Sequence, residues 1–172
     1  FDELINVSLS YRLSLGQLPF LEVREAFQTG ALILAPFLKL YTLLTGTTDG
    51  IVLFSRLLYL LAMLLLAILT YRSFRTITAH KNAFYLAYLC PFFQILSLYY
   101  LWYDSLLVVF LTASSLFLYG AVVKKNRSNA FLAGILAGIM ALCYPSAVII
   151  PFVMIGVLIA VERKITQTTL FY

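Results

Sequence analysis

Residues 51–71 read IVLFSRLLYLLAMLLLAILTY, an apolar run in which Arg56 is the one charged residue. As an α-helix this run is long enough to cross the roughly 30 Å hydrocarbon core of a bilayer. The whole chain has the same character, with 63% hydrophobic and 11% charged residues. Soluble proteins average about 45–50% apolar and 25% charged residues. The sequence therefore predicts an all-α integral membrane protein.

Further apolar runs follow residues 51–71 and predict a polytopic bundle of about five transmembrane helices. Residues 130–161 are too long for one ordinary span, and Cys143-Tyr144-Pro145-Ser146 interrupts them near the middle. Because a residue before proline is biased out of the helical conformation, we expect two short spans joined by a tight turn. The predicted spans after 51–71 are 83–101, 105–123, 130–143 and 146–161.

Residues 1–50 are predicted to form a segment outside the bilayer with juxtamembrane helices. An amphipathic stretch at the start ends near Gly16 and Pro19, which favours a helix lying at the interface. The next apolar run, Ala31–Leu44, is shorter than the ~17–25 residues that a span needs. Residues 51–172 then form the transmembrane bundle. Because the chain opens on Phe1, we expect one partial domain of a longer protein that lacks a preceding transmembrane helix.

The basic residues fall in three short clusters between apolar runs, so the net charge of +5 indicates membrane topology and not nucleic-acid binding. The alternate loops, around 102–104 and 144–146, contain no Lys or Arg. Basic short loops stay cytoplasmic, which predicts that residues 1–50 and Asp104 are extracytoplasmic. The clusters comprise Arg72, Arg75, His80 and Lys81, then Lys124, Lys125 and Arg127, then Arg163 and Lys164.

Asp104 is the only acidic residue between Asp49 and Glu162. An ionisable group at membrane level is a functional hypothesis by default, although a water-exposed turn would explain it too. The predicted topology puts Asp104 on the same face as Asp2 and Glu3. Converging carboxylates at a membrane surface can hold a divalent metal ion or serve as a general base.

Two further patterns predict local features. Asn6-Val7-Ser8 and Asn126-Arg127-Ser128 match the N-glycosylation sequon, and the second match is predicted to be cytoplasmic. Gly134 and Gly138 form a small-xxx-small pattern, which predicts close packing between helices.

The order of these motifs resembles the GT-C membrane glycosyltransferases, including the protein O-mannosyltransferase and aminoarabinose-transferase group. Phe1-Asp2-Glu3 followed by LGQLPF at 15–20 is similar to their first external loop, with its acidic pair and "G-x-x-P" stretch. Gly46 after the short helix and Arg56 in the next span continue the similarity. Tyr103-Asp104-Ser105-Leu106-Leu107 resembles the second hallmark, an aspartate heading a Leu- and Phe-rich span.

The resemblance implies inverting transfer of a hexosyl or pentosyl group from a polyprenyl-phosphate donor to an acceptor at the extracytoplasmic face. It implies catalytic roles for Asp2 and Asp104, which would also be the ligands of any divalent metal ion. Glu3, Arg56 and Tyr144 would bind substrate. Relatives often have a lysine where Tyr144 stands, so recognition of the donor phosphate departs from the family pattern. The implied setting is a bacterial plasma membrane and its cell-envelope pathways, and the chain by itself is expected to be inactive.

Two other classes of function remain open at this point. A transporter or flippase-like protein would use Asp104 as a proton or cation site, and such sites usually lie near the midplane of the bilayer. A non-catalytic scaffold subunit of the cell envelope would let Asp2 and Asp104 diverge toward bulk water.

Overall fold

All regular secondary structure in the described residues, 2–23, 28–94, 101–124 and 126–170, is helical, which confirms the all-α prediction. The computed structural model gives only the backbone for residues 2, 90–94, 124 and 161–170. The helices are α1 (Asp2–Ser14), α2 (Gln28–Thr45), α3 (Ile51–Phe74), α4 (His80–Gln94), α5 (Tyr103–Lys124), α6 (Arg127–Cys143), the 3₁₀ helix η1 (Pro145–Val148) and α7 (Ile149–Leu170).

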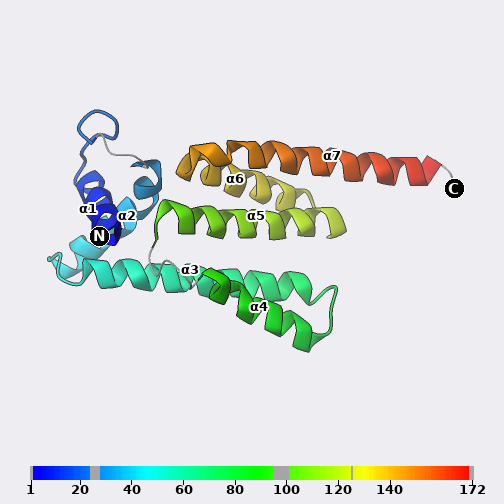
Figure 1. The fold of residues 1–172 in the computed structure, drawn as a ribbon, viewed down its shortest axis with the longest axis horizontal. Coiled ribbons are helices and arrows are strands. Elements are labelled where there is room, and N and C mark those ends of the chain that lie inside the picture. The colour runs from blue at the N-terminus through cyan, green and yellow to red at the C-terminus, as the bar shows by residue number, and fades with distance from the viewer. Residues whose placement is uncertain (1, 24–27, 95–100, 125, 171–172) are drawn as a thin grey trace.

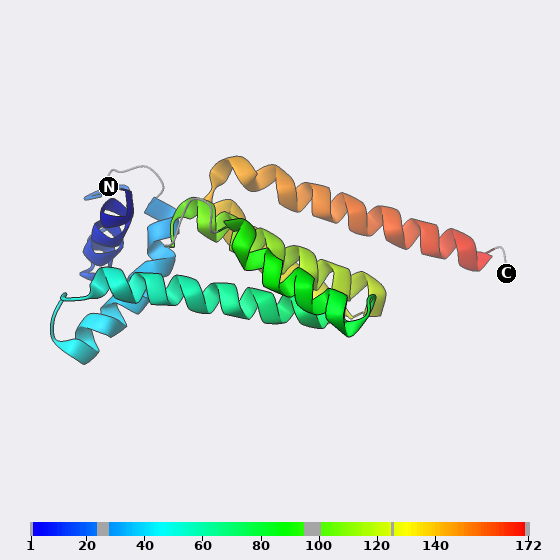
Figure 2. The same cartoon turned by 60° about the horizontal axis from the view of Figure 1, so that its bottom comes forward.

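The helices form an elongated bundle with two different ends (Figure 1). Helices α3, α5, α6 and α7 run along the long axis, α4 folds back along α3, and α1 and α2 lie together across one end. We call that end, where α3 and α5 begin and α6 ends, the capped end. We call the opposite end, where α3 ends and α6 begins, the basic end, because Arg72, Arg75, Lys81 and Arg127 lie there. Figure 2 shows the same separation from a second direction.

Two of the described helices are long and apolar enough to cross a membrane, α3 and the part of α5 from Tyr103 to Val123. Shorter apolar helices cover Arg127–Cys143 and Pro145–Ala160. The expected break between the last two segments is present, because α6 ends at Cys143 and η1 begins at Pro145. The predicted segment 83–101 falls partly on α4, and its residues 95–100 lie outside the described residues. The number of crossings and their direction stay predictions.

Helix α3 has one inward stripe and a broad apolar outer surface. The stripe repeats at helical spacing and consists of Ser55, Tyr59, Met63, Leu66 and Thr70. Leucines such as Leu53, Leu60 and Leu64 cover the other side and are more than half exposed. A helix with polar groups inside and leucine outside suits lipid surroundings.

The contact between α5 and α6 uses alanines where glycines were predicted. Ala133, Ala137 and Met140 are buried, and the Ser114 hydroxyl donates a 2.7 Å hydrogen bond to the carbonyl of Ala133. Gly134 and Gly138 are exposed, and a Cβ added at either would meet open space. The prediction of a glycine packing face is therefore wrong. Each residue turns about 100° around a helix, so a shift of one position leaves the interface.

Candidate functional site

One hydrophobic cluster joins five helices beneath the capped end. The cluster brings Val7 of α1 together with the middle of α2, the third and fourth turns of α3 and the first turn of α5. Such close-packed contacts fix the helix ends relative to one another. The buried members are Val7, Leu34, Leu38, Tyr59, Met63, Leu101, Leu106 and Cys143.

Glu3 and Arg56 form a two-pronged ion pair across the capped end. Arg56 Nε and Nη2 donate to the two Glu3 carboxylate oxygens at 2.8 and 2.6 Å. The Glu3 side chain is 16% exposed and that of Arg56 is 52% exposed, so the pair stands at the rim of the helix bundle. A forked guanidinium–carboxylate contact of this kind adds orientation as well as attraction. It couples the start of α1 to α3, and Glu3 is held by a partner within the protein.

The position of Arg56 depends on the turn that precedes α3. Gly50 is the N-cap residue and has a φ of 79°, in the left-handed region that favours glycine. A Cβ at this position would lie 3.0 Å from the Tyr41 hydroxyl, which donates a hydrogen bond to the carbonyl of Asp49. The Tyr41 ring also stacks on Phe54 with centroids 4.7 Å apart. The end of α2 therefore sets where α3 begins.

Asn6 connects α1 to the segment that leads into α5. Its side chain is 5% exposed, and its amide Nδ2 donates a hydrogen bond to the carbonyl of Leu101. A buried amide with such a bond is a poor acceptor for a glycan, so the sequon match at Asn6 has a structural explanation. Sequence reasoning singled out Asn6 only as a sequon match and did not predict its contact with the Leu101 carbonyl. Asn126 at the other sequon match caps α6 by accepting the Ser128 N–H at 2.9 Å.

Asp104 lies in the first turn of α5, where the sequence had suggested a loop. The Ser105 hydroxyl accepts the Trp102 N–H at 2.7 Å, and the Leu106 N–H donates to the Trp102 carbonyl at 2.8 Å, so Trp102 caps the helix. The dipole of α5 favours a negative charge at this end. Asp104 is partly exposed and forms no ion pair with any residue that the structure describes. It has a side-chain hydrogen bond with Tyr103 and lies at a helix end that favours its negative charge.

Two aromatic rings place Tyr144 beside the start of α5. The Tyr103 and Tyr144 rings stack with centroids 5.6 Å apart and planes 22° apart. Tyr144 is the C-cap residue of α6, directly before η1. Tyr103 also lies close to α2, because a Cβ added on Gly30 of α2 would lie 3.4 Å from Tyr103 Cβ. Asp104 and Tyr144 were predicted from separate motifs. They thus lie on neighbouring segments at the same end of the helix bundle.

Asp2 opens α1, and its side chain lies outside the described residues. Its backbone is one helical turn before Asn6, which corresponds to about 6 Å along the axis. The convergence of the Asp2 and Asp104 carboxylates stays a prediction. The side chains described in 3–23, 28–89, 101–123 and 126–160 contain no group of three or more His, Cys, Asp or Glu residues that could hold a metal ion.

Residues 30–172 match the sequence profile of a family described as dolichyl-phosphate-mannose-protein mannosyltransferase. Arg56, Asp104 and Tyr144 lie within the matched residues, whereas Asp2 and Glu3 precede them. No curated protein and no solved structure matches the chain.

Proposed function

We propose that this chain, which belongs to the dolichyl-phosphate-mannose-protein mannosyltransferase family and so to the GT-C-type membrane glycosyltransferases, carries its transfer site at the capped end. The donor would be a sugar linked to a polyprenyl phosphate, and the acceptor would bind at the extracytoplasmic face. The observation that carries the proposal is the Asp104 carboxylate, which begins α5 without a cationic partner in the described residues. A carboxylate that no cation neutralises can accept a proton from the acceptor, as a general base must.

The proposed reaction exchanges one bond at the anomeric carbon for another and moves one proton. The acceptor oxygen attacks the anomeric carbon of the sugar, and the bond from that carbon to the phosphate oxygen breaks with inversion. The acceptor proton passes to a carboxylate, for which Asp2 and Asp104 are the candidates, with the second carboxylate orienting the acceptor. The lipid phosphate leaves with the electron pair of the broken bond.

Arg56 and Tyr144 are the proposed contacts for the donor phosphate. An arginine has five N–H donors, and the contact with Glu3 uses Nε and Nη2, so N–H groups remain on a side chain that is half exposed. Tyr144 supplies a hydroxyl where many relatives have a lysine. Glu3 then acts as a positioning residue that orients Arg56. A divalent cation at this end would take Asp2 and Asp104 as its protein ligands, since both Glu3 oxygens are bonded to Arg56.

The position of Asp104 favours transfer chemistry over transport. Transporter sites usually lie near the midplane on broken helices, whereas Asp104 lies in the first turn of an unbroken α5. Interfacial aromatic residues, Trp102 and Tyr103, flank it, as they do at the boundary of a bilayer.

The test is Asp104→Asn in the complete enzyme that contains this chain, assayed in membranes with a polyprenyl-phosphate sugar. Because proton transfer by a positioned side chain contributes about 10²–10⁴-fold to a rate, we expect transfer to fall at least about 100-fold. Asp49→Asn is the matched control, since Asp49 is an exposed carboxylate in the turn before α3 at the same end. Equal rates of transfer for wild type and Asp104→Asn would remove the proposed site, and absence of transfer by both proteins would support a scaffold role.

A further inference from the structure

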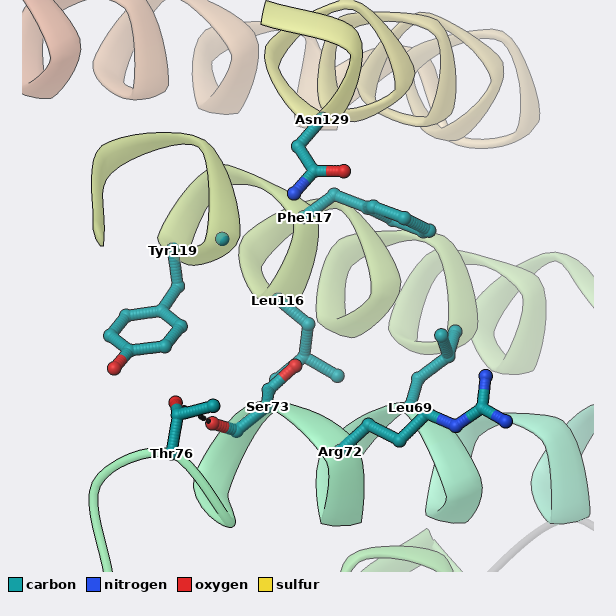
Figure 3. Close-up of a pocket in the computed structure, with 9 residues that line it drawn as sticks. Leu69, Arg72, Ser73, Thr76, Leu116, Phe117, Tyr119 and Asn129 are labelled. Carbon is teal, nitrogen blue, oxygen red and sulfur yellow. Dashed lines mark hydrogen bonds between the residues drawn. The ribbon is translucent and has the colours of Figure 1, made fainter. Parts of the chain in front are cut away.

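A small polar cavity lies at the basic end, away from the proposed transfer site. Its volume is about 140 Å³, and α3, α5 and α6 line it (Figure 3). That volume is several times the space that one water molecule needs. The polar residues of its lining are Arg72, Ser73, Thr76, Tyr119 and Asn129.

The polar groups of this cavity are mostly donors without protein partners. Among the described residues, neither the Arg72 guanidinium nor the Asn129 amide forms a hydrogen bond or ion pair. Thr76 is the exception, because its hydroxyl donates to the carbonyl of Ser73 at 2.7 Å, as Figure 3 marks. No carboxylate lines the cavity. A guanidinium, an amide and a hydroxyl around one space suit an anion with several oxygen atoms.

Gly120 gives Asn129 its place in the cavity wall. A Cβ at Gly120 would lie 2.8 Å from Asn129 Nδ2, so the amide occupies the space that a side chain would fill. In Figure 3 the Asn129 side chain reaches from α6 toward α5, across the cavity from Ser73 and Thr76.

A larger apolar cavity adjoins this one. A cavity of about 450 Å³ follows the seam between α3 and α5, and all of its lining residues are apolar. Leu69 and Phe117 line both cavities. The Arg72 side chain lies along α3 beside Leu69 (Figure 3). The two cavities together have the shape of an amphiphile, with a polar head at the basic end and an apolar tail toward the bundle centre.

We infer that these two adjoining cavities bind one anionic phospholipid, with the phosphodiester at Arg72, Ser73 and Asn129 and an acyl chain along the α3–α5 seam. Charge complementarity selects this occupant. From residue 51 to residue 161 the one acidic residue is Asp104, which lies at the other end of the bundle, while basic residues gather at this end. Basic pockets between transmembrane helices are suited to the head groups of anionic lipids.

Native mass spectrometry of the delipidated protein in detergent tests the inference. The probes are dioleoyl phosphatidylglycerol and dioleoyl phosphatidylcholine, which share acyl chains and differ in net charge. We expect phosphatidylglycerol to remain bound preferentially. Arg72→Gln should weaken its retention about fivefold, the effect of one basic residue at an anionic lipid. Gly120→Ala should weaken retention without any change of charge, because the new methyl group displaces the Asn129 amide.

Arg75→Gln is the matched control, since it removes the same charge one turn away at an exposed residue outside the cavity lining. We expect it to keep the preference. Equal losses for Arg72→Gln and Arg75→Gln would mean diffuse surface attraction and would overturn the inference. So would displacement of the lipid by inorganic phosphate, which would mean a site for free anions. Displacement by a short polyprenyl phosphate in preference to phosphatidylglycerol would assign the seam to the donor and overturn it as well.

Discussion

The two ends of the helix bundle treat their charged and polar groups in opposite ways. At the capped end Glu3 is bonded to Arg56 and Asn6 to the Leu101 carbonyl, and each contact joins residues more than 50 positions apart. At the basic end Arg72, Arg75 and Arg127 form no ion pair with any residue in the described ranges. Long-range partners order a set of side chains in advance, which binding and catalysis need. Cations without partners remain available to lipids and to the membrane potential.

Charged side chains that only gather at one end and charged side chains that protein partners hold in place are suited to different functions. Both ends contain many charged residues, yet at the basic end the folded chain does not fix their orientation through partners. At the capped end hydrogen bonds hold Glu3, Arg12, Glu22 and Arg56. The first two predictions below remove a functional group from the capped end. The last two measure how much single contacts contribute.

The largest effect is expected from Asp2→Asn. If Asp2 shares the chemistry with Asp104, the rate of sugar transfer falls at least about 100-fold while the protein still inserts into membranes. Initial rates in membranes, normalised to protein amount, measure this. Asp49→Asn serves again as the control for loss of one carboxylate at this end. A normal rate in Asp2→Asn would leave Asp104 as the single carboxylate of the site.

Asn6→Ala and Asn129→Ala together compare how much an asparagine side chain contributes to stability at each end. Asn6→Ala leaves the Leu101 carbonyl buried without its donor, which costs about 1–3 kcal/mol. Thermal unfolding in detergent should therefore occur at a lower temperature. Asn129→Ala at the basic end should leave the unfolding temperature unchanged, because its amide bonds to no described residue. Similar shifts in both variants would contradict the contrast between the ends.

Glu3→Arg and Arg56→Glu test whether the ion pair positions the transfer site. Each single change places like charges together and should lower transfer severalfold, while the combined exchange restores part of it. The expected effect is moderate because half of the Arg56 side chain is exposed, and exposed pairs contribute little. Transfer rates of the four proteins form a double-mutant cycle. Additive losses would show that the pair has no positioning role.

Ser55→Ala is expected to have the smallest effect. The Ser55 hydroxyl is fully buried on α3 without a hydrogen-bond partner among the described residues, so its removal leaves stability unchanged or raises it. Ser114→Ala is the matched change at a buried serine whose hydroxyl is bonded to the Ala133 carbonyl. That variant should lose about 0.6 kcal/mol, the average for hydrogen bonds between membrane helices. Thermal unfolding compares the two, and a larger loss at Ser55 would reveal a partner for its hydroxyl.

Local patterns were sufficient to predict much of the architecture. The apolar runs, Gly46 after α2 and the break at Cys143–Ser146 predicted where helices begin and end, and the gathering of basic residues between runs agrees with one common end of the bundle. The prediction that Gly134 and Gly138 pack against another helix is wrong, and the reason is also local. The sequence shows small residues at 133, 134, 137 and 138, and it does not show which pair faces α5.

The sequence by itself determined the helices, the membrane character and the separation of acidic from basic residues, because these follow from side-chain polarity over short stretches. Only the tertiary structure decided that Arg56 bonds to Glu3, that Asn6 holds the Leu101 carbonyl and that Tyr103 stacks on Tyr144. It also decided that a cavity lined by Arg72 and Asn129 at the basic end adjoins an apolar cavity between α3 and α5. Each of these contacts joins helices that are distant in sequence, and its formation depends on how their faces pack together.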